Sequence, residues 1–262
     1  MNRRHWLAAM ASAVAVLQGC ATGRDTQPVF VLVHGAWHGA KCWERVTPLL
    51  TQAGYAVHTP TLPGQGERAA EISTAITLDT HIASVCEYIE SRNLRNVVLV
   101  GHSYGGVVIT GVADRIAPRL KRLVYLDALI FENGQSLASI SGPVTWEARM
   151  KTVREQGRGV GLPPYPPAAF GVMNAEDAAW LTPQLTLQPV NTFAQPLVLR
   201  APFGNGLPKV YIDCNLPAMA AVTPFKAKVR QSPGWTYESL ASGHDAMVIV
   251  PRELAAMLLR HA

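Results

Sequence analysis

Residues 97–109 limit the folds open to this chain more than any other segment, because they join an apolar run, a glycine-rich turn and a second apolar run. The turn places Ser103 between Gly101 and Gly105 in the pattern G-x-S-x-G. Glycines on both sides of the serine let a strand and a helix pack closely around a strained turn, which exposes the hydroxyl. The helix that follows presents its first amide groups to developing negative charge. The pattern predicts a nucleophilic serine at the edge of an α/β sheet.

Further apolar runs of strand length lie on both sides of this turn, at residues 28–33, 123–126, 210–212 and 235–237. Such runs suit strands that are buried on both faces of a parallel sheet, and the segments between them are long enough for crossover helices. With 48% hydrophobic and 16% charged residues, the 262-residue chain can build one large core, which argues against disorder or a coiled coil. The sequence therefore predicts an α/β fold with a doubly wound, mostly parallel sheet.

Residues from about 131 to 200 interrupt this alternation. They contain two segments with helical character, 146–154 and 175–181, and the proline-rich run 161–167. Open α/β sheets bind their ligands at the carboxyl ends of the strands, and long insertions at such sites are often functional. We therefore predict a helical, proline-rich lid over the carboxyl edge of the sheet.

The N-terminal segment has the composition of an export signal. Residues 2–5 are Asn-Arg-Arg-His, and residues 6–17 are an uncharged stretch that is too short to cross a bilayer as a helix. The sequence Leu-Gln-Gly-Cys that ends at Cys20 resembles the bacterial lipobox, in which cleavage before the cysteine leaves a thiol that carries lipid. These features predict a bacterial lipoprotein.

In this interpretation residues 1–19 are a signal peptide. Residues 20–28 are the lipidated Cys20 and a short linker, and one globular domain spans residues 29–262. Two acyl chains give stable attachment, so we expect the protein on the periplasmic side of a membrane. The alternative is that Cys20 is an ordinary residue of a leader, and Sec and twin-arginine export are both open. The 23 basic and 18 acidic residues leave too small an excess to indicate a nucleic-acid partner.

A serine nucleophile needs an imidazole that takes its proton and two amide donors that bind the oxyanion. His244 follows the last predicted strand, which is where the order serine, acid, histidine places the base. Tyr104 follows the nucleophile and Ala36 lies in the loop after the first strand, so their N–H groups are predicted to form the oxyanion hole. We expect Trp37 and Met247 to contact the substrate.

Residues 30–44, the turn 101–106 and the pair Gly243-His244 together resemble the α/β-hydrolase superfamily. Within it they resemble the branch that contains plant methyl esterases, hydroxynitrile lyases and bacterial carboxylesterases. The resemblance covers nearly the whole predicted domain apart from the lid and implies ester hydrolysis. The lyases have a threonine at Gly35 and a lysine where this chain has Asp245, so the esterase is favoured. Nothing in the sequence indicates a metal or an organic cofactor.

The position of the triad acid differs from the pattern of that branch. In that branch the acid follows the strand that corresponds to the one ending near Cys214 in this chain. This chain has an uncharged Leu-Pro pair at that point. Some α/β-hydrolases, the haloalkane dehalogenases among them, carry the acid one strand after the nucleophile, where this chain has Asp127. We predict that Asp127 orients His244. The rivals are Asp213, which lies too early on the usual strand, and Asp245, which we expect to face outward.

Together these residues predict attack of Ser103 on a small or medium carboxylic ester, an acyl-enzyme, and hydrolysis by water. The same triad could cleave an amide, a thioester or a lactone. A non-catalytic ligand-binding protein on the hydrolase scaffold is the alternative of a different class, because a fold does not fix a function.

Overall fold

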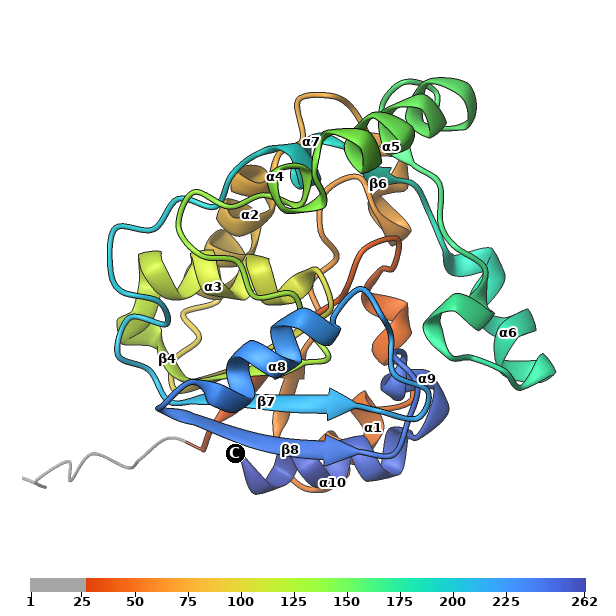
Figure 1. Ribbon diagram of the computed structural model, residues 1–262. Helices are drawn as coiled ribbons and strands as arrows, with labels where there is room; N and C mark the ends of the chain where they lie inside the picture. The colour runs from red at the N-terminus through yellow and green to blue at the C-terminus, as the bar shows by residue number, and fades with distance from the viewer. Residues whose placement is uncertain (1–26) are drawn as a thin grey trace, which may run out of the picture.

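The computed structural model describes residues 27–262, so the predicted signal peptide and Cys20 lie outside the described residues. Six parallel strands form one sheet in the order β2-β1-β3-β4-β7-β8 (Figure 1). Their bounds are β1 Val29–Val33, β2 Ala56–His58, β3 Val97–His102, β4 Leu120–Leu126, β7 Lys209–Cys214 and β8 Trp235–Leu240. The doubly wound α/β sheet predicted from the sequence is confirmed.

Helices cover both faces of this sheet. In Figure 1, α2, α3 and α8 lie on one side of it and α1 and α10 on the other. Their bounds are α1 Thr47–Gln52, α2 Leu78–Ser91, α3 Gly105–Ile116, α8 Thr223–Gln231, α9 Ala246–Ile249 and α10 Pro251–Arg260. The apolar stripe of α2, which includes Ile82, Val85 and Ile89, is buried, and every residue of β3 is buried between the layers. The core therefore lies between the sheet and the helices that cover its two faces.

The insertion, residues 131–200, lies between β4 and β7 and adds no strand to the main sheet. It contains α4 Leu137–Ser141, α5 Pro143–Gln156, α6 Ala175–Leu181 and α7 Asn191–Ala194, with an antiparallel pair of two-residue strands, β5 Gly161–Leu162 and β6 Gln188–Pro189. Five short 3-10 helices complete the described part of the chain: Ala40–Trp43, Gly66–Glu71, Ala117–Arg119, Pro167–Phe170 and Thr182–Gln184.

Within residues 27–262, no helix combines the length and the apolar character that crossing a bilayer would need. Cys42, Cys86 and Cys214 are buried free thiols. Burial raises the pKa of each thiol, so these cysteines are poor nucleophiles.

Candidate active site

Ser103 lies on the turn between β3 and α3, where its backbone has a left-handed φ of 54°. The turn is held from three directions, because the Ser103 N–H donates to the Leu126 carbonyl and the Ser103 carbonyl accepts from the N–H groups of Gly106 and Leu129, each at 3.0 Å. A non-glycine residue keeps this conformation only when its surroundings fix it. The serine is therefore presented at the carboxyl end of β3 as the G-x-S-x-G pattern predicts.

The flanking glycines are required by space. A Cβ on Gly101 would lie 2.5 Å from the carbonyl oxygen of Gly105, and a Cβ on Gly105 would lie 2.8 Å from the carbonyl oxygen of His34. Both contacts are with backbone atoms, which cannot rotate away. Side chains at these two positions would push strand, turn and helix apart.

His244 lies in the loop after β8, and its ring is fixed by a carboxylate. Its Nδ1 donates to Oδ2 of Asp127 at 2.6 Å, and both residues are buried. Asp127 directly follows β4 and has a left-handed φ of 44°, and its N–H donates to the carbonyl of Ile212 at 2.8 Å. The structure thus brings together the two residues that the sequence named as base and acid.

The second oxygen of Asp127 is also held. Its Oδ1 accepts from the Cys214 N–H at 3.1 Å and lies 2.7 Å from Nζ of Lys226, which lies 2.7 Å from Asp213 as well. Burial alone would lower the pKa of Lys226, but the two carboxylates raise it above its usual value, so the lysine is charged. Lys226 was not predicted from the sequence. The only sequence signal is its position three residues before Val229, on the buried face of α8.

The two rival acids have other partners. Asp213 is held by Lys226 and accepts from the Tyr237 hydroxyl at 2.7 Å, so it does not orient His244. Asp245 was expected to face outward, and this expectation is wrong. Asp245 is completely buried, and its Oδ2 accepts from Nε2 of His38 at 3.0 Å. Its inward orientation is stabilised by the imidazole of His38, which lies on the loop after β1.

His38 is held at both ring nitrogens, since Nδ1 lies 2.7 Å from the carbonyl oxygen of Ala36 and Nε2 lies on Asp245. Both partners are acceptors, so both nitrogens carry a proton and the ring is an imidazolium. Burial would lower the pKa of His38, but the Asp245 carboxylate raises it above the ordinary value. The pair joins the loop after β1 to the loop that carries His244.

His102 lies between these two pairs. Burial lowers its pKa well below the usual value, so the ring is neutral and its Nε2 donates to the His244 carbonyl at 3.1 Å. Potential ligand atoms of His102, His244 and Asp245 lie within 4.8 Å of one another. His244 Nδ1 is already bonded to Asp127 and Asp245 Oδ2 to His38, so protein contacts hold this group together and we assign it no metal.

Among residues 27–262, His244 is the one buried histidine that has one nitrogen on a carboxylate and no hydrogen bond at the other. The Ser103 hydroxyl likewise makes no hydrogen bond within that range. Catalytic hydrogen bonds are commonly long in unliganded enzymes and tighten when substrate binds. A serine hydroxyl reaches new partners by rotation about a single bond.

Two amide groups lie beside this serine without a partner. Within the described part of the chain, the N–H groups of Ala36 and Tyr104 donate to no protein acceptor. Both residues line the pocket that Ser103 lines. These are the two donors that the sequence analysis assigned to the oxyanion hole.

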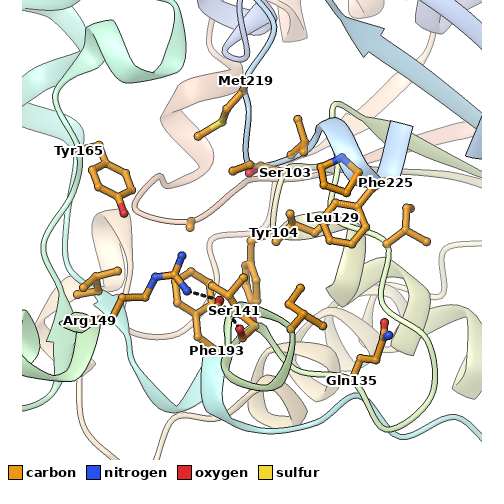
Figure 2. A pocket seen from close by; sticks show the side chains of 18 of the residues that line it. Ser103, Tyr104, Leu129, Gln135, Ser141, Arg149, Tyr165, Phe193, Met219 and Phe225 are labelled. Atoms are coloured by element: carbon orange, nitrogen blue, oxygen red, sulfur yellow. Dashed lines mark hydrogen bonds between the residues drawn. The ribbon is translucent and has the colours of Figure 1, made fainter. Parts of the chain in front are cut away.

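The pocket at Ser103 has a volume of about 440 Å³ (Figure 2). Its wall is largely apolar and includes Trp37, Tyr165 and Phe193. Trp37 thus lies where the sequence analysis expected it. Met247 does not, because it is completely buried in α9 and is not part of the pocket wall. It packs in the core beneath the histidine loop.

Residues 30–257 match the profile of the Alpha/beta hydrolase family. The chain belongs to the α/β-hydrolase family. A carbendazim hydrolyzing esterase from Nocardioides sp. (strain SG-4G) is 39% identical over 237 residues, which cover 87% of this chain and 97% of that protein. A pheophorbidase from Raphanus sativus is 28% identical and covers 91% of this chain and 95% of its own length.

Solved structures of this family share the fold. An extracellular α/β-hydrolase from a Paenibacillus species has a TM-score of 0.76 at 23% identity and covers 89% of this chain and 98% of its own. A methylesterase from Arabidopsis has a TM-score of 0.72 at 24% identity, with 90% and 98% covered. The sequence relatives include esterases and methylesterases, and this α/β-hydrolase is a carboxylesterase-type enzyme.

Proposed function

We propose that this α/β-hydrolase cleaves carboxylic esters through an acyl-enzyme on Ser103, with His244 as general base and Asp127 as the acid that orients it. One observation carries the proposal: the His244 ring is fixed at Nδ1 by the buried Asp127 carboxylate, while its other nitrogen is unpaired among the described residues. This arrangement sets the tautomer in which Nε2 accepts a proton.

The reaction follows from this geometry. Ser103 Oγ attacks the ester carbonyl as its proton passes to His244 Nε2, and the oxyanion accepts hydrogen bonds from the N–H groups of Ala36 and Tyr104. His244 then gives the proton to the departing alkoxide, which leaves as the alcohol. Water, deprotonated by His244, attacks the acyl-enzyme, and Ser103 recovers its proton as the acid is released.

The pocket suggests the size of the substrate. A cavity of about 440 Å³ suits a small or medium ester. Residues of the insertion such as Tyr165 and Phe193 form part of its wall, and we propose that the insertion acts as a lid over the site. Carbendazim belongs in a substrate panel because the Nocardioides relative is named for hydrolysing it.

A lyase is less well supported. A threonine at Gly35 would bring a Cβ within 2.9 Å of Ser103 Cβ and 2.8 Å of His102 Nδ1. The His102 ring or the turn at Ser103 would have to shift to admit that side chain.

Labelling with a fluorophosphonate probe and turnover of p-nitrophenyl acetate and butyrate test the proposal. We expect Ser103→Ala to abolish labelling and to reduce turnover by at least about 10³-fold, in line with the loss of a triad nucleophile. Ser136→Ala, which removes a buried helix-capping serine that does not line the pocket, should still be labelled. A folded wild-type protein without labelling or turnover would favour the ligand-binding alternative.

For the N-terminus we propose lipidation of Cys20 and a place on the periplasmic face of a bacterial membrane. The basic, apolar and Cys-terminated order of the leader supports this proposal. Expression with radiolabelled palmitate tests it, because wild type should incorporate label into the membrane fraction and Cys20→Ser should not. Equal incorporation into both proteins would contradict it.

A further inference from the structure

The pocket that contains Ser103 also contains a cation that has no acidic partner among the described residues. Arg149 lies on α5 of the insertion and lines the same cavity as Ser103, Ala36 and Tyr104. Figure 2 shows its guanidinium pointing into the centre of the cavity, with the hydroxyl of Ser141 beside it. A charged group that shares a pocket with the nucleophile is placed to contact the molecule being cleaved.

The other basic residues of α5, and the other basic residue of the pocket wall, lie beside acids. Arg154 pairs with Glu147 at 2.6 Å, Lys151 lies 3.9 Å from Glu155, and Lys228 pairs with Glu132. Arg149 forms no salt bridge within residues 27–262. As far as residues 27–262 are concerned, the pocket therefore holds a positive charge that no carboxylate compensates.

The one polar contact of Arg149 in the described chain leaves most of its donors unused. Its Nη1 donates to Oγ of Ser141, whose own proton is directed to the Leu137 carbonyl at 2.6 Å. A guanidinium has five N–H donors in a planar fork. The Ser141 contact fixes one edge of the group and leaves donors directed into the cavity.

The wall around this charge is apolar, with Ile140, Leu162 and Phe193 among its members. Electrostatic interactions are stronger in such surroundings than in water, and a guanidinium binds a carboxylate with two parallel hydrogen bonds. A carboxylate is the group that matches both the charge and the fork.

We propose that Arg149 binds a carboxylate on the substrate, so that the preferred substrates are esters that carry a free carboxylate remote from the scissile bond, such as half-esters of dicarboxylic acids. The inference rests on the proposed ester hydrolysis at Ser103. In this arrangement the ester carbonyl lies between the amides of Ala36 and Tyr104, and the carboxylate lies at Arg149. The distance between the two sites selects the length of the diacid.

The test compares monomethyl esters of succinic, glutaric, adipic and pimelic acid with methyl alkanoates of the same chain lengths, with acid release followed in a pH-stat. For wild type we expect kcat/KM to favour the acidic ester at one chain length. Arg149→Met should lower the ratio of acidic to neutral kcat/KM by roughly 10- to 100-fold, mainly through KM, as expected for loss of a charged hydrogen-bonding pair. Arg149→Lys should be intermediate, because it keeps the charge and loses the fork.

Arg154→Met is the matched control, because it removes a cation from the exposed side of the same helix and should leave the ratio unchanged. Thermal unfolding of each variant shows whether α5 and the domain remain folded. Equal kcat/KM for acidic and neutral esters in wild type, or an unchanged ratio in Arg149→Met, would overturn the role of Arg149 while hydrolysis of neutral esters still supported the proposed function.

A binding measurement separates the two proposals. Calorimetric titration of Ser103→Ala with the favoured half-ester should show binding that weakens when Arg149→Met is added. Binding that depends on Arg149 without turnover by wild type would sustain the carboxylate site and reject the catalytic role of Ser103. Binding that is equal with and without Arg149 would reject the carboxylate site.

Discussion

Two buried histidine–carboxylate pairs lie next to each other at the carboxyl edge of the sheet. They differ in the hydrogen bonding of the imidazole nitrogen that faces away from the carboxylate. In His244–Asp127 the outer imidazole nitrogen has no partner in the described chain, and the acid is also supported by Lys226. In His38–Asp245 both imidazole nitrogens are occupied, and among the described residues the acid pairs with no lysine or arginine. In the proposed mechanism the first pair transfers a proton, whereas the second joins two loops.

A short histidine–aspartate distance does not by itself identify a catalytic pair. The distances are 2.6 Å and 3.0 Å, and both pairs are buried. What distinguishes them is the far imidazole nitrogen, which has no hydrogen-bond partner among the described residues in His244 and is bonded in His38. Breaking each pair separately should therefore affect different measured quantities.

The largest expected effect is on turnover. Asp127→Asn should lower kcat by about 10⁴-fold, because the asparagine amide no longer sets the His244 tautomer. Asp245→Asn should lower kcat by no more than about tenfold, since the pair it breaks only positions loops. Steady-state kinetics with p-nitrophenyl butyrate measure both. A larger loss from Asp245→Asn than from Asp127→Asn would reverse the assignment.

The next effect is on stability, and here breaking the His38–Asp245 pair should cost more than breaking the His244–Asp127 pair. His38→Gln leaves the buried Asp245 carboxylate without its cation and should reduce the free energy of unfolding by roughly 3–5 kcal/mol. His244→Gln should cost about 1–2 kcal/mol, because Lys226 and the Cys214 N–H still hold Asp127. Urea denaturation of the two variants measures the difference. Equal losses would show that the pairs are energetically alike.

The smallest effect is a pH dependence of the structural pair. The folded pKa of His38 is raised above 6.5, so its stabilisation is fully present below about pH 6.5 and is lost as pH rises through the folded value. The folded pKa of Asp245 is lowered from 3.8 by the neighbouring imidazoles despite burial, so its part is lost as pH falls through that value.

Urea denaturation from pH 4 to 9 of wild type and of the double variant His38→Gln, Asp245→Asn measures this dependence. We expect the stability difference to be level between about pH 4 and 6.5 and to shrink in alkaline solution. A difference that grows above pH 6.5 would contradict a charged His38.

The sequence was sufficient to predict the central strands and those site residues that stand at the end of a predicted strand. The uncharged runs predicted the central strands, and G-x-S-x-G predicted the turn at Ser103. Asp127 was predictable because a carboxylate directly after β4 must lie near the end of β3, since the two strands are paired through His102 and Leu126. Chain order then identified His244.

The remaining features depend on contacts between residues far apart in the chain. β2 was missed because it has three residues, is an edge strand and is partly exposed, so it lacks the apolar run of a buried strand. The inward direction of Asp245 depends on His38, which lies 207 positions away. Lys226 resembles any surface lysine of a helix until β7 and Asp127 are placed beside it.

Lys226 lies 2.7 Å from a carboxylate at the end of β4 and 2.7 Å from another on β7. One ammonium group thus compensates acids from two neighbouring strands, and the main charge balance of the site does not depend on which strand carries the acid that serves the imidazole. A hydrolase built in this way could exchange the strand of origin of its acid during evolution without rebuilding the surrounding core. For enzyme engineering, this means that the acid of the triad could be placed on either of two neighbouring strands, provided that its carboxylate reaches the same position.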